Sequence, residues 1–290
     1  MKVSIILVNF NGTKHTVACV ASIRAHAPSF PYEVIVVDNG SSDAEKESLK
    51  RQLPDCTVVQ NDKNIGFGGA NNIGAARAKG ELLFFLNNDT IVTSDVVTPL
   101  AEAMDRSPGM GLVGPALCNV DGTFQVSFGR FPSLVKEWQT RSFGNRFNRL
   151  DPGNVGVVEE SVREWITGAA MLVRKKCFDQ LGGFDESYFM YFEDVDLCYR
   201  ARRLGFEIGY LADFSIIHLG GTSYVSGDSG IRREYRRSQL RFYDKFQSLP
   251  ERFMLRVYLL LKAFAMLFTD ARTSAAIAGL VFRFHGSTKA

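Results

Sequence analysis

The sequence has 290 residues, of which 46% are hydrophobic and 22% are charged, and its formal net charge is +3. These values suit a globular chain with one sizeable core, or one core and a small appendage, and exclude a disordered chain. So small a net charge does not indicate a nucleic-acid partner, and none is expected.

Five cysteines are scattered along the chain without a CxxC pair. This spacing favours a reducing compartment over a disulfide framework or a zinc site. The apolar run at the N-terminus is too short for a signal peptide, so a cytoplasmic location is the expectation.

The first third of the chain alternates segments of strand and helix character. The predicted strands lie at residues 3–8, 33–37, 57–59 and 82–86. The predicted helices lie between them, at residues 13–26, 44–53 and 69–79. Strand–helix alternation at this spacing predicts a parallel, doubly wound sheet.

The character of the sequence changes between about residues 112 and 165. The stretch 128–156 is rich in Gly, Pro, Asn and Arg, which predicts an irregular, partly mobile segment. Beyond it we expect a strand at 165–173, a short helix to Leu181 and a longer helix from about Asp194 to Gly205.

Polar side chains close several of the predicted strands. Asn9 and Asn11 follow the first strand, Asp38 the second and Asp89 the fourth. Ligands of open α/β sheets bind beyond the carboxyl ends of the strands, so these residues favour a nucleotide-sized crevice. The alternative is that they only form turns, for which Asp38 and its two successors are well suited.

A glycine-rich segment at 64–74 opens the predicted third helix. Its glycines do not match G-x-G-x-x-G, and it follows the third strand rather than the first, so it is a poor dinucleotide fingerprint. A glycine-rich turn at a helix N-terminus still allows a ligand to approach the backbone closely.

Two residues are candidate metal ligands. Asp89 comes directly after a strongly apolar strand, and one carboxylate suffices for a divalent cation that bridges a diphosphate. His218 ends another apolar run, and neutral imidazole suits Mn²⁺ or a related metal. The alternatives are an Asx turn at Asp89 and a satisfied core histidine at His218.

A second acidic cluster contains Glu193, Asp194 and Asp196 and directly follows four apolar residues. We expect Glu193 and Asp194 in or just before the first turn of a helix, where the helix dipole favours their ionised forms. An ionised carboxylate beside an acceptor hydroxyl can act as a general base. The alternative is that Asp194 only caps the helix.

These motifs, in this order, resemble those of the glycosyltransferase family 2 enzymes over roughly residues 2–222. The resemblance implies an α/β fold of GT-A type, with a Rossmann-like mixed sheet flanked by helices. It also implies a catalytic domain at 1–225, with a nucleotide-binding half at 1–115 and an acceptor and catalytic half at 116–225.

The same resemblance implies roles for individual residues in an inverting, metal-dependent reaction. Asp194, next to Glu193, resembles the catalytic base, while Asp89 and His218 match the ligands of Mg²⁺ or Mn²⁺. Asn87 stands where the family's D-x-D motif has its first aspartate, so the metal depends mainly on Asp89. Residues implied to bind the nucleotide-sugar donor are Asn9, Asn11, Asp38, Asn64, Gly66, Asn72, Asn87 and Asn88, with Asp38 hydrogen-bonded to the base.

Within the family the sequence is most similar to bacterial rhamnosyltransferases of surface-polysaccharide assembly. This likeness lies in the segments 165–171, 182–186 and 191–194. It implies dTDP-L-rhamnose as donor and a glycan or lipid-diphosphate-linked acceptor. Galactofuranosyl- and glucosyltransferases share much of the pattern and stay open as alternatives.

Residues 226–290 form a basic, amphipathic C-terminal extension. The apolar stretch 253–268 contains two charges, whereas a transmembrane helix needs about 20 uninterrupted apolar residues. It predicts a helix lying on the inner face of the plasma membrane. Packing on the domain or on a second subunit of a homo-oligomer is the alternative. The segment 275–281, with Phe282 and Phe284, predicts a further buried or interfacial helix.

Two other functional classes fit the sequence less well. A dinucleotide-dependent oxidoreductase requires a glycine-rich phosphate turn after the first strand, which the sequence at 9–13 lacks. An inactive nucleotide-sugar-binding subunit at the membrane is favoured only by Asn87 in place of an aspartate.

Overall fold

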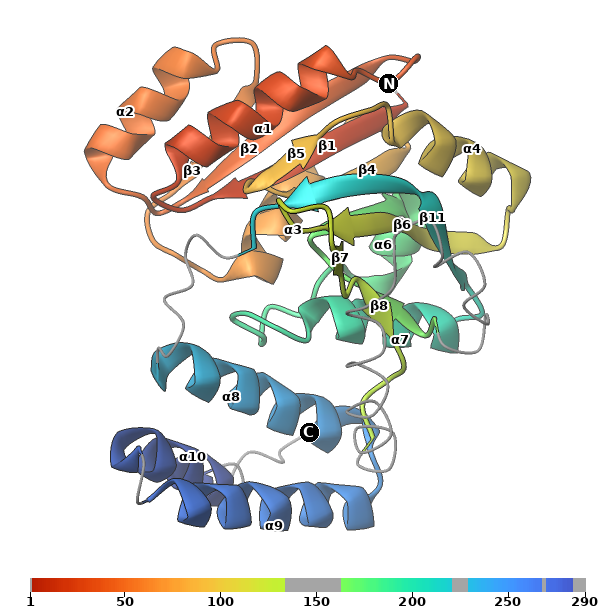
Figure 1. Ribbon diagram of the computed structural model, residues 1–290. Helices are drawn as coiled ribbons and strands as arrows, with labels where there is room; N and C mark the ends of the chain where they lie inside the picture. The colour runs from red at the N-terminus through yellow and green to blue at the C-terminus, as the bar shows by residue number, and fades with distance from the viewer. Residues whose placement is uncertain (1, 134–162, 221–228, 268–269, 284–290) are drawn as a thin grey trace.

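The computed structural model describes residues 2–133, 163–220, 229–267 and 270–283 (Figure 1). The strands are β1 Val3–Asn9, β2 Tyr32–Asn39, β3 Thr57–Asn61, β4 Leu82–Asn87, β5 Thr90–Val92, β6 Met110–Cys118, β7 Phe124–Gln125, β8 Phe128–Gly129, β9 Trp165–Ile166, β10 Ala170–Arg174 and β11 Glu207–His218. The helices are α1 Thr13–Ala25, α2 Asp43–Gln52, α3 Phe67–Arg77, α4 Val97–Arg106, α6 Lys175–Leu181, α7 Glu193–Arg203, α8 Ser229–Phe246, α9 Leu249–Met266 and α10 Ala271–Arg283.

The main sheet has the strand order β3-β2-β1-β4-β10-β6-β11-β5, with β7 paired to β6. Strands β1 to β4 are mutually parallel, and β10 runs antiparallel to both β4 and β6. Because β11 is parallel to β6, both point the same way as β1 to β4. Their carboxyl ends therefore share one edge, and the expected mixed α/β sheet is confirmed.

Alternating side chains divide the core between the two faces of the sheet. Along β1, Ile5 packs with α1, α2 and α4, whereas its neighbour Ile6 packs with α3, α6 and α7. Successive residues of a strand point to opposite faces, so an uninterrupted apolar strand is buried on both sides. This double covering leaves the carboxyl edge of the sheet available for a ligand.

The structure differs from the sequence-based expectation in the middle of the chain. The strand predicted at 165–173 is broken: β9 pairs with β8, and β10 belongs to the main sheet. Between them the backbone leaves the ladder, since Gly168 N–H donates to Asp194 Oδ2 instead. Helix α4 and strand β6 were not predicted. Most of the irregular segment predicted at 128–156 lies outside the described residues.

Helices α8, α9 and α10 pack on one another, with α8 nearest to α7 and to the sheet and α9 farther away (Figure 1). Phe192 and Val195 share an apolar cluster with Phe242 of α8 and Leu255 of α9. Lys245 of α8 also forms ion pairs with Asp185 and with the fully buried Asp196. The extension is thus joined to the domain that carries the acidic cluster.

The amphipathic helix predicted at 253–268 corresponds to α9, and the helix predicted at 275–281 corresponds to α10. Phe284 lies outside the described residues. Among the helices described, none is both long and apolar enough to cross a membrane.

Candidate active site

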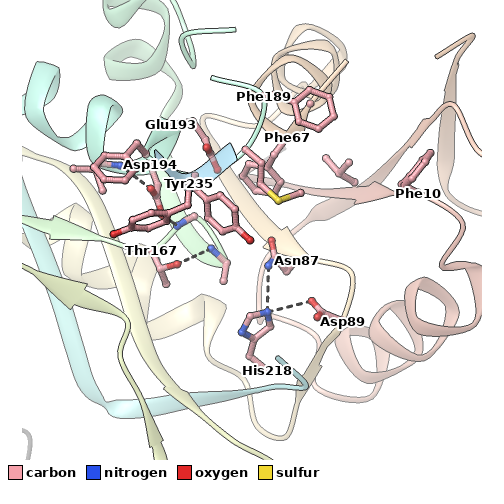
Figure 2. Close-up of a pocket in the computed structure, with 18 of the residues that line it drawn as sticks. Phe10, Phe67, Asn87, Asp89, Thr167, Phe189, Glu193, Asp194, His218 and Tyr235 are labelled. Atoms are coloured by element: carbon pink, nitrogen blue, oxygen red, sulfur yellow. Dashed lines mark hydrogen bonds and ion pairs between the residues drawn. The ribbon is translucent and has the colours of Figure 1, made fainter. Parts of the chain in front are cut away.

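A cleft of about 860 Å³ lies at the carboxyl edge of the sheet (Figure 2). Its walls come from strand ends, from the starts of α3 and α7, and from α8. The predicted site residues that line it are Asn11, Asn64, Gly66, Asn87, Asn88, Asp89, Glu193, Asp194 and His218. The volume is within the roughly 300–1,000 Å³ common for small-molecule sites.

Asp38 and Asn9 are fully buried and do not line the cleft. Asp38 Oδ2 accepts from Asn9 Nδ2 at 2.8 Å, and its Oδ1 accepts from the backbone N–H of Ser41 at 3.0 Å. Ser41 Oγ in turn accepts from the backbone N–H of Asn11 at 2.8 Å. This arrangement does not fit the expected hydrogen bond between Asp38 and a base, because the carboxylate is fully buried outside the cleft lining and is bonded to the loop that presents Asn11.

Asn39, the residue after Asp38, lines the cleft although it was not predicted. Its Nδ2 donates to Asn64 Oδ1 at 2.9 Å and to the Gly66 carbonyl at 3.2 Å. Asn39 therefore connects the end of β2 to the turn before α3. The motif at 38–43 was correctly placed near the cleft, but the neighbouring side chain faces it.

Gly66 brings the start of α3 against the segment that leads into α7. Its φ of +88° favours glycine, and an added Cβ would lie 2.5 Å from the carbonyl oxygen of Phe189. The next residue, Phe67, donates its N–H to the same carbonyl at 2.9 Å. Backbone contact thus joins the two halves of the cleft.

Asn72 has a structural position in α3, outside the cleft lining. Its Nδ2 donates to the Phe184 carbonyl at 2.9 Å and to Glu186 Oε1 at 3.0 Å, and its Oδ1 accepts from the N–H of Phe184. A direct contact of Asn72 with a donor, as the resemblance implied, does not fit these bonds. It fastens the connection between α6 and α7.

One end of the cleft is built around Asp89 and His218, which follow β4 and end β11. His218 Nε2 lies 3.2 Å from Asp89 Oδ1 and 3.2 Å from Asn87 Nδ2. His218 Nδ1 lies 2.6 Å from Gln125 Oε1. An amide oxygen only accepts, so the Nδ1 atom carries a proton, and in the neutral imidazole Nε2 is the acceptor that faces Asp89 and Asn87.

This donor set fits a divalent cation. In that tautomer Asp89 Oδ1 and His218 Nε2 are both acceptors and lie 3.2 Å apart, an arrangement that a shared cation would stabilise. No group of three or more His, Cys, Asp or Glu residues suited to a metal occurs in the described part of the chain. The remaining ligands would come from diphosphate oxygens and water, as is usual for Mg²⁺.

The other end of the cleft is built around Glu193 and Asp194 at the start of α7 (Figure 2). Asp194 accepts from the backbone N–H groups of Gly168 at 2.9 Å and Val195 at 2.8 Å. Glu193 is only 6% exposed, and its Oε2 has no hydrogen-bond partner among the described residues. A buried oxygen left without a partner on the cleft wall is suited to a substrate hydroxyl.

Burial raises the pKa of both carboxyl groups. The pKa of Glu193 lies well above its ordinary value because of burial and then because of the neighbouring Asp194 charge. The pKa of Asp194 is also raised by burial, although its backbone hydrogen bonds oppose the shift. Burial of these groups therefore works against the helix dipole, which favours their ionised forms. A dipole contributes about 0.3–1 kcal/mol, less than the cost of desolvating a carboxylate.

The acid pair is presented by a backbone that non-glycine residues rarely adopt. Tyr191 and Phe192 have φ angles of +68° and +67°, in the left-handed region. Such residues cost about 1–3 kcal/mol each and persist only when their surroundings hold them. Tyr235 of α8 stacks edge-on against both, with ring centroids 5.7 and 5.3 Å away, and Phe242 contacts Phe192. Helix α8 thus supports the turn that presents Glu193 and Asp194.

Several lining residues have no sequence motif. Arg130, Tyr235 and Arg236 all line the cleft, the last two from α8. Gln125 fixes the tautomer of His218 from β7. Only tertiary packing brings them to the site, and none was predicted.

The family model described as "Glycosyl transferase family 2" matches residues 4–163, more than half of the chain, and the chain belongs to this family. It is therefore a glycosyltransferase. The match covers Asp89 and the asparagines of the cleft, whereas Glu193, Asp194 and His218 lie beyond it.

The chain has curated bacterial relatives of similar size. It is 28% identical over 232 residues to the N-acetylglucosaminyl-diphospho-decaprenol L-rhamnosyltransferase of Mycobacterium tuberculosis, covering 74% of this chain and 75% of the relative. It is 28% identical over 195 residues to the rhamnosyltransferase WbbL of Escherichia coli K12, covering 64% of this chain and 73% of the relative.

Solved structures share the fold. The mannosyltransferase PcManGT of Pyrobaculum calidifontis, in complex with GDP-Man and Mn²⁺, gives a TM-score of 0.58 at 17% identity and covers 100% of this chain and 76% of that chain. S. aureus TarS 1–349 in complex with UDP gives a TM-score of 0.55 at 16% identity and covers 94% of this chain and 74% of that chain. The GT-A-type fold expected from the sequence is thus confirmed.

Proposed function

We propose that the protein is an inverting, metal-dependent transferase that moves a sugar from a nucleotide diphosphate-sugar to a hydroxyl of its acceptor. The observation that carries this proposal is one cleft with two opposed chemical ends. Asp89 and His218 offer acceptor atoms to a cation, and Asp194 offers a half-buried carboxylate with a raised pKa. A nucleotide-sugar complex of a protein with the same fold supports the choice of donor.

Asp194 takes the proton of the acceptor hydroxyl while that oxygen forms a bond to the anomeric carbon. The bond between the anomeric carbon and the diphosphate oxygen breaks, and its electron pair leaves with the nucleoside diphosphate. A bound Mg²⁺ or Mn²⁺, held by Asp89 and His218, would neutralise charge on the leaving diphosphate. Attack from the face opposite the leaving group inverts the anomeric configuration without a covalent intermediate.

Asp38 has a positioning role in this proposal. Through Ser41 it shapes the loop that carries Asn11, and Asn39 ties that loop to Asn64. Donor contacts fall to the lining side chains Asn11, Asn64 and Asn88 and to the backbone at Gly66.

The proposed donor sugar is L-rhamnose, as dTDP-L-rhamnose, and the proposed acceptor is a sugar linked through diphosphate to a lipid. Both choices are supported by two relatives, the N-acetylglucosaminyl-diphospho-decaprenol L-rhamnosyltransferase and the rhamnosyltransferase WbbL. At 28% identity a different hexose remains a defined outcome of the test below.

The test is a thermal-shift panel of dTDP-rhamnose, UDP-glucose, UDP-galactofuranose and GDP-mannose, each with and without Mn²⁺. A ligand at 100 times its Kd stabilises the folded state by about 2.7 kcal/mol, so the true donor should give the largest shift, and only with metal. Metal-dependent hydrolysis of that donor should vanish in Asp89→Ala. An inactive binding subunit would show the shift without hydrolysis, and no shift with any donor would reject the proposal.

Membrane contact at the cytoplasmic face is proposed for one face of α9. Large apolar side chains recur there at intervals of three or four residues, which places them on one side of a helix. Their exposed fractions are Leu249 76%, Phe253 68%, Val257 39%, Leu261 65% and Phe264 65%. The opposite side, with Leu255 and Leu259, is buried against the neighbouring helices.

Flotation with phosphatidylcholine vesicles, with and without phosphatidylglycerol, tests this contact. Exchanging Phe253→Ser should weaken binding about 10- to 100-fold, because burying a Phe side chain stabilises by about 1.5–3 kcal/mol. Val120, 71% exposed on the turn after β6, provides the matched control Val120→Ser. Equal losses in both variants, or no binding by the natural sequence, would exclude α9 as the contact.

A further inference from the structure

Two arginines line the cleft but have no part in the reaction described above. Arg236 belongs to α8, and Arg130 directly follows β8. They are the only lysine or arginine side chains among the described residues of the lining. Of the acidic residues of the lining, Asp89 is assigned to the metal, Asp194 to proton transfer and Glu193 to a substrate hydroxyl.

Arg236 is held in place before any ligand arrives. Its Nη1 donates to Oε1 of the buried Gln239 at 2.5 Å, and its guanidinium lies 5.2 Å from the ring centroid of Tyr235. Tyr235 in turn packs against Tyr191. The bond to Gln239 uses part of the guanidinium and leaves further N–H donors for a ligand, so little side-chain entropy is lost on binding.

The backbone at Arg130 is fixed on the same wall. The carbonyl of Arg130 accepts from Trp165 Nε1 at 2.9 Å, and the next residue, Phe131, donates its N–H to Glu164 Oε2 at 2.5 Å. The Arg130 side chain itself is exposed. Trp165 and Arg130 therefore reach the cleft as a joined pair, an aromatic surface beside a cation.

The position of the wall formed by Arg130, Trp165 and α8 indicates which substrate it contacts, the donor or the acceptor. Tyr235 lies on the side of the cleft that holds Asp194, whereas Asn87, Asp89 and His218 form the other side (Figure 2). The acceptor hydroxyl must meet Asp194, so the acceptor occupies the side formed by α8. Guanidinium groups bind phosphate oxygens in bidentate fashion, which gives a diphosphate the right chemistry for two arginines.

We infer that Arg130 and Arg236 bind the diphosphate of a sugar-diphospho-lipid acceptor, which deepens the proposed function and rests on it. The aromatic side chains Trp165, Tyr191 and Tyr235 line the same cleft as the two arginines and Asp194, and they offer ring surfaces to the acceptor sugar. Helix α8 then connects the acceptor's charged group to α9, whose exposed apolar face is the proposed lipid contact.

The test is calorimetric titration of the full chain with octyl diphosphate, in the presence of saturating dTDP or UDP and Mn²⁺. We expect Arg236→Gln and Arg130→Gln each to raise the Kd for octyl diphosphate about 10- to 100-fold, the range for a hydrogen bond to a charged group. Arg236→Lys should recover part of the loss. Arg233→Gln, on an exposed position of α8 outside the lining, is the matched control and should bind like the natural sequence.

The results separate this inference from the proposed function. Unchanged octyl diphosphate binding in both glutamine variants would overturn the inference, as would no binding by the natural sequence. An equal loss of dTDP or UDP affinity would also overturn it, because the arginines would then hold the donor. A different result would reject the proposed function itself: the protein with the natural sequence would bind neither dTDP nor UDP and would hydrolyse no donor.

Discussion

The acidic side chains at the two ends of the cleft differ in their exposure and in their polar partners. At the end formed by β4 and β11, the side chains of Asp89 and His218 keep 14% and 15% of their surface exposed, and each has a polar partner. At the end formed by α7, Glu193 is buried and one of its oxygens has no partner among the described residues. The pKa values of Glu193 and Asp194 are raised, chiefly by burial.

This difference shows how one fold gives two functions to the same functional group. A carboxylate that binds a cation has to stay ionised, and a polar partner and solvent favour that state. A carboxylate that receives a proton works best when its pKa approaches the working pH, and burial moves it in that direction. The predictions below test each end separately.

The largest effect is expected from Asp194→Asn. Because amide oxygen is a far weaker base than carboxylate, turnover should fall by about 10²–10⁴-fold, the usual contribution of a general base. The thermal shift produced by the donor should persist, since Asn can keep the bond from the Gly168 N–H. Steady-state turnover and donor-induced shift are measured on the same preparation.

Asp213→Asn, at an exposed position of β11, serves as the control and should keep full turnover. Turnover that is unchanged in Asp194→Asn would remove Asp194 from the role of base. Loss of the donor-induced shift would instead make it a binding residue.

A smaller effect is expected at the opposite end from Gln125→Leu. Without its acceptor, the Nδ1 proton of His218 is unsatisfied, and the imidazole loses the bond that orients Nε2 toward Asp89. Loss of such a supporting bond lowers metal affinity about 10- to 100-fold. Mn²⁺ titration of donor hydrolysis measures the change, and Gln125→Glu, which keeps an acceptor oxygen, should restore most of it. Equal Mn²⁺ affinity in Gln125→Leu would contradict a metal role for His218.

Sequence reasoning succeeded where a residue closes a continuous apolar strand. The runs before Asn9 and Asn87 predict buried parallel strands, and parallel strands end at one edge. Asp89, Asp194 and His218 do lie in one cleft, although they are distant in the chain. The order of the motifs was sufficient to predict a shared cleft, because the direction of a strand decides at which edge of the sheet its last residue lies.

Sequence reasoning failed where the direction of a side chain or a long-range contact decides whether a residue lines the cleft. Alternation along β2 does not reveal which of Asp38 and Asn39 faces a ligand, and Asn39 does. Strand β6 starts directly after Pro108 and Gly109 and contains Gly111, and such a cluster of proline and glycine is typical of a turn. In the fold an added Cβ there would lie 2.9 Å from Cys177 Sγ, so the glycine serves close packing. Arg236 reaches the cleft only because α8 packs on α7.

The smallest effect is expected in stability, from Glu193→Gln. Since the pKa of Glu193 is raised in the folded protein, the folded state keeps a proton that the unfolded chain loses above the ordinary carboxyl range. Wild-type stability therefore falls as pH rises from the ordinary value through the raised one, whereas Gln has no proton to lose. The thermal midpoint of the variant should exceed that of the wild type at pH 7, and the advantage should shrink toward pH 4.5.

An advantage on the order of 1 kcal/mol corresponds to about 2–4 °C. The same difference at both pH values would mean that Glu193 does not titrate differently on folding, and the contrast between the two ends of the cleft would then rest on Asp194 alone.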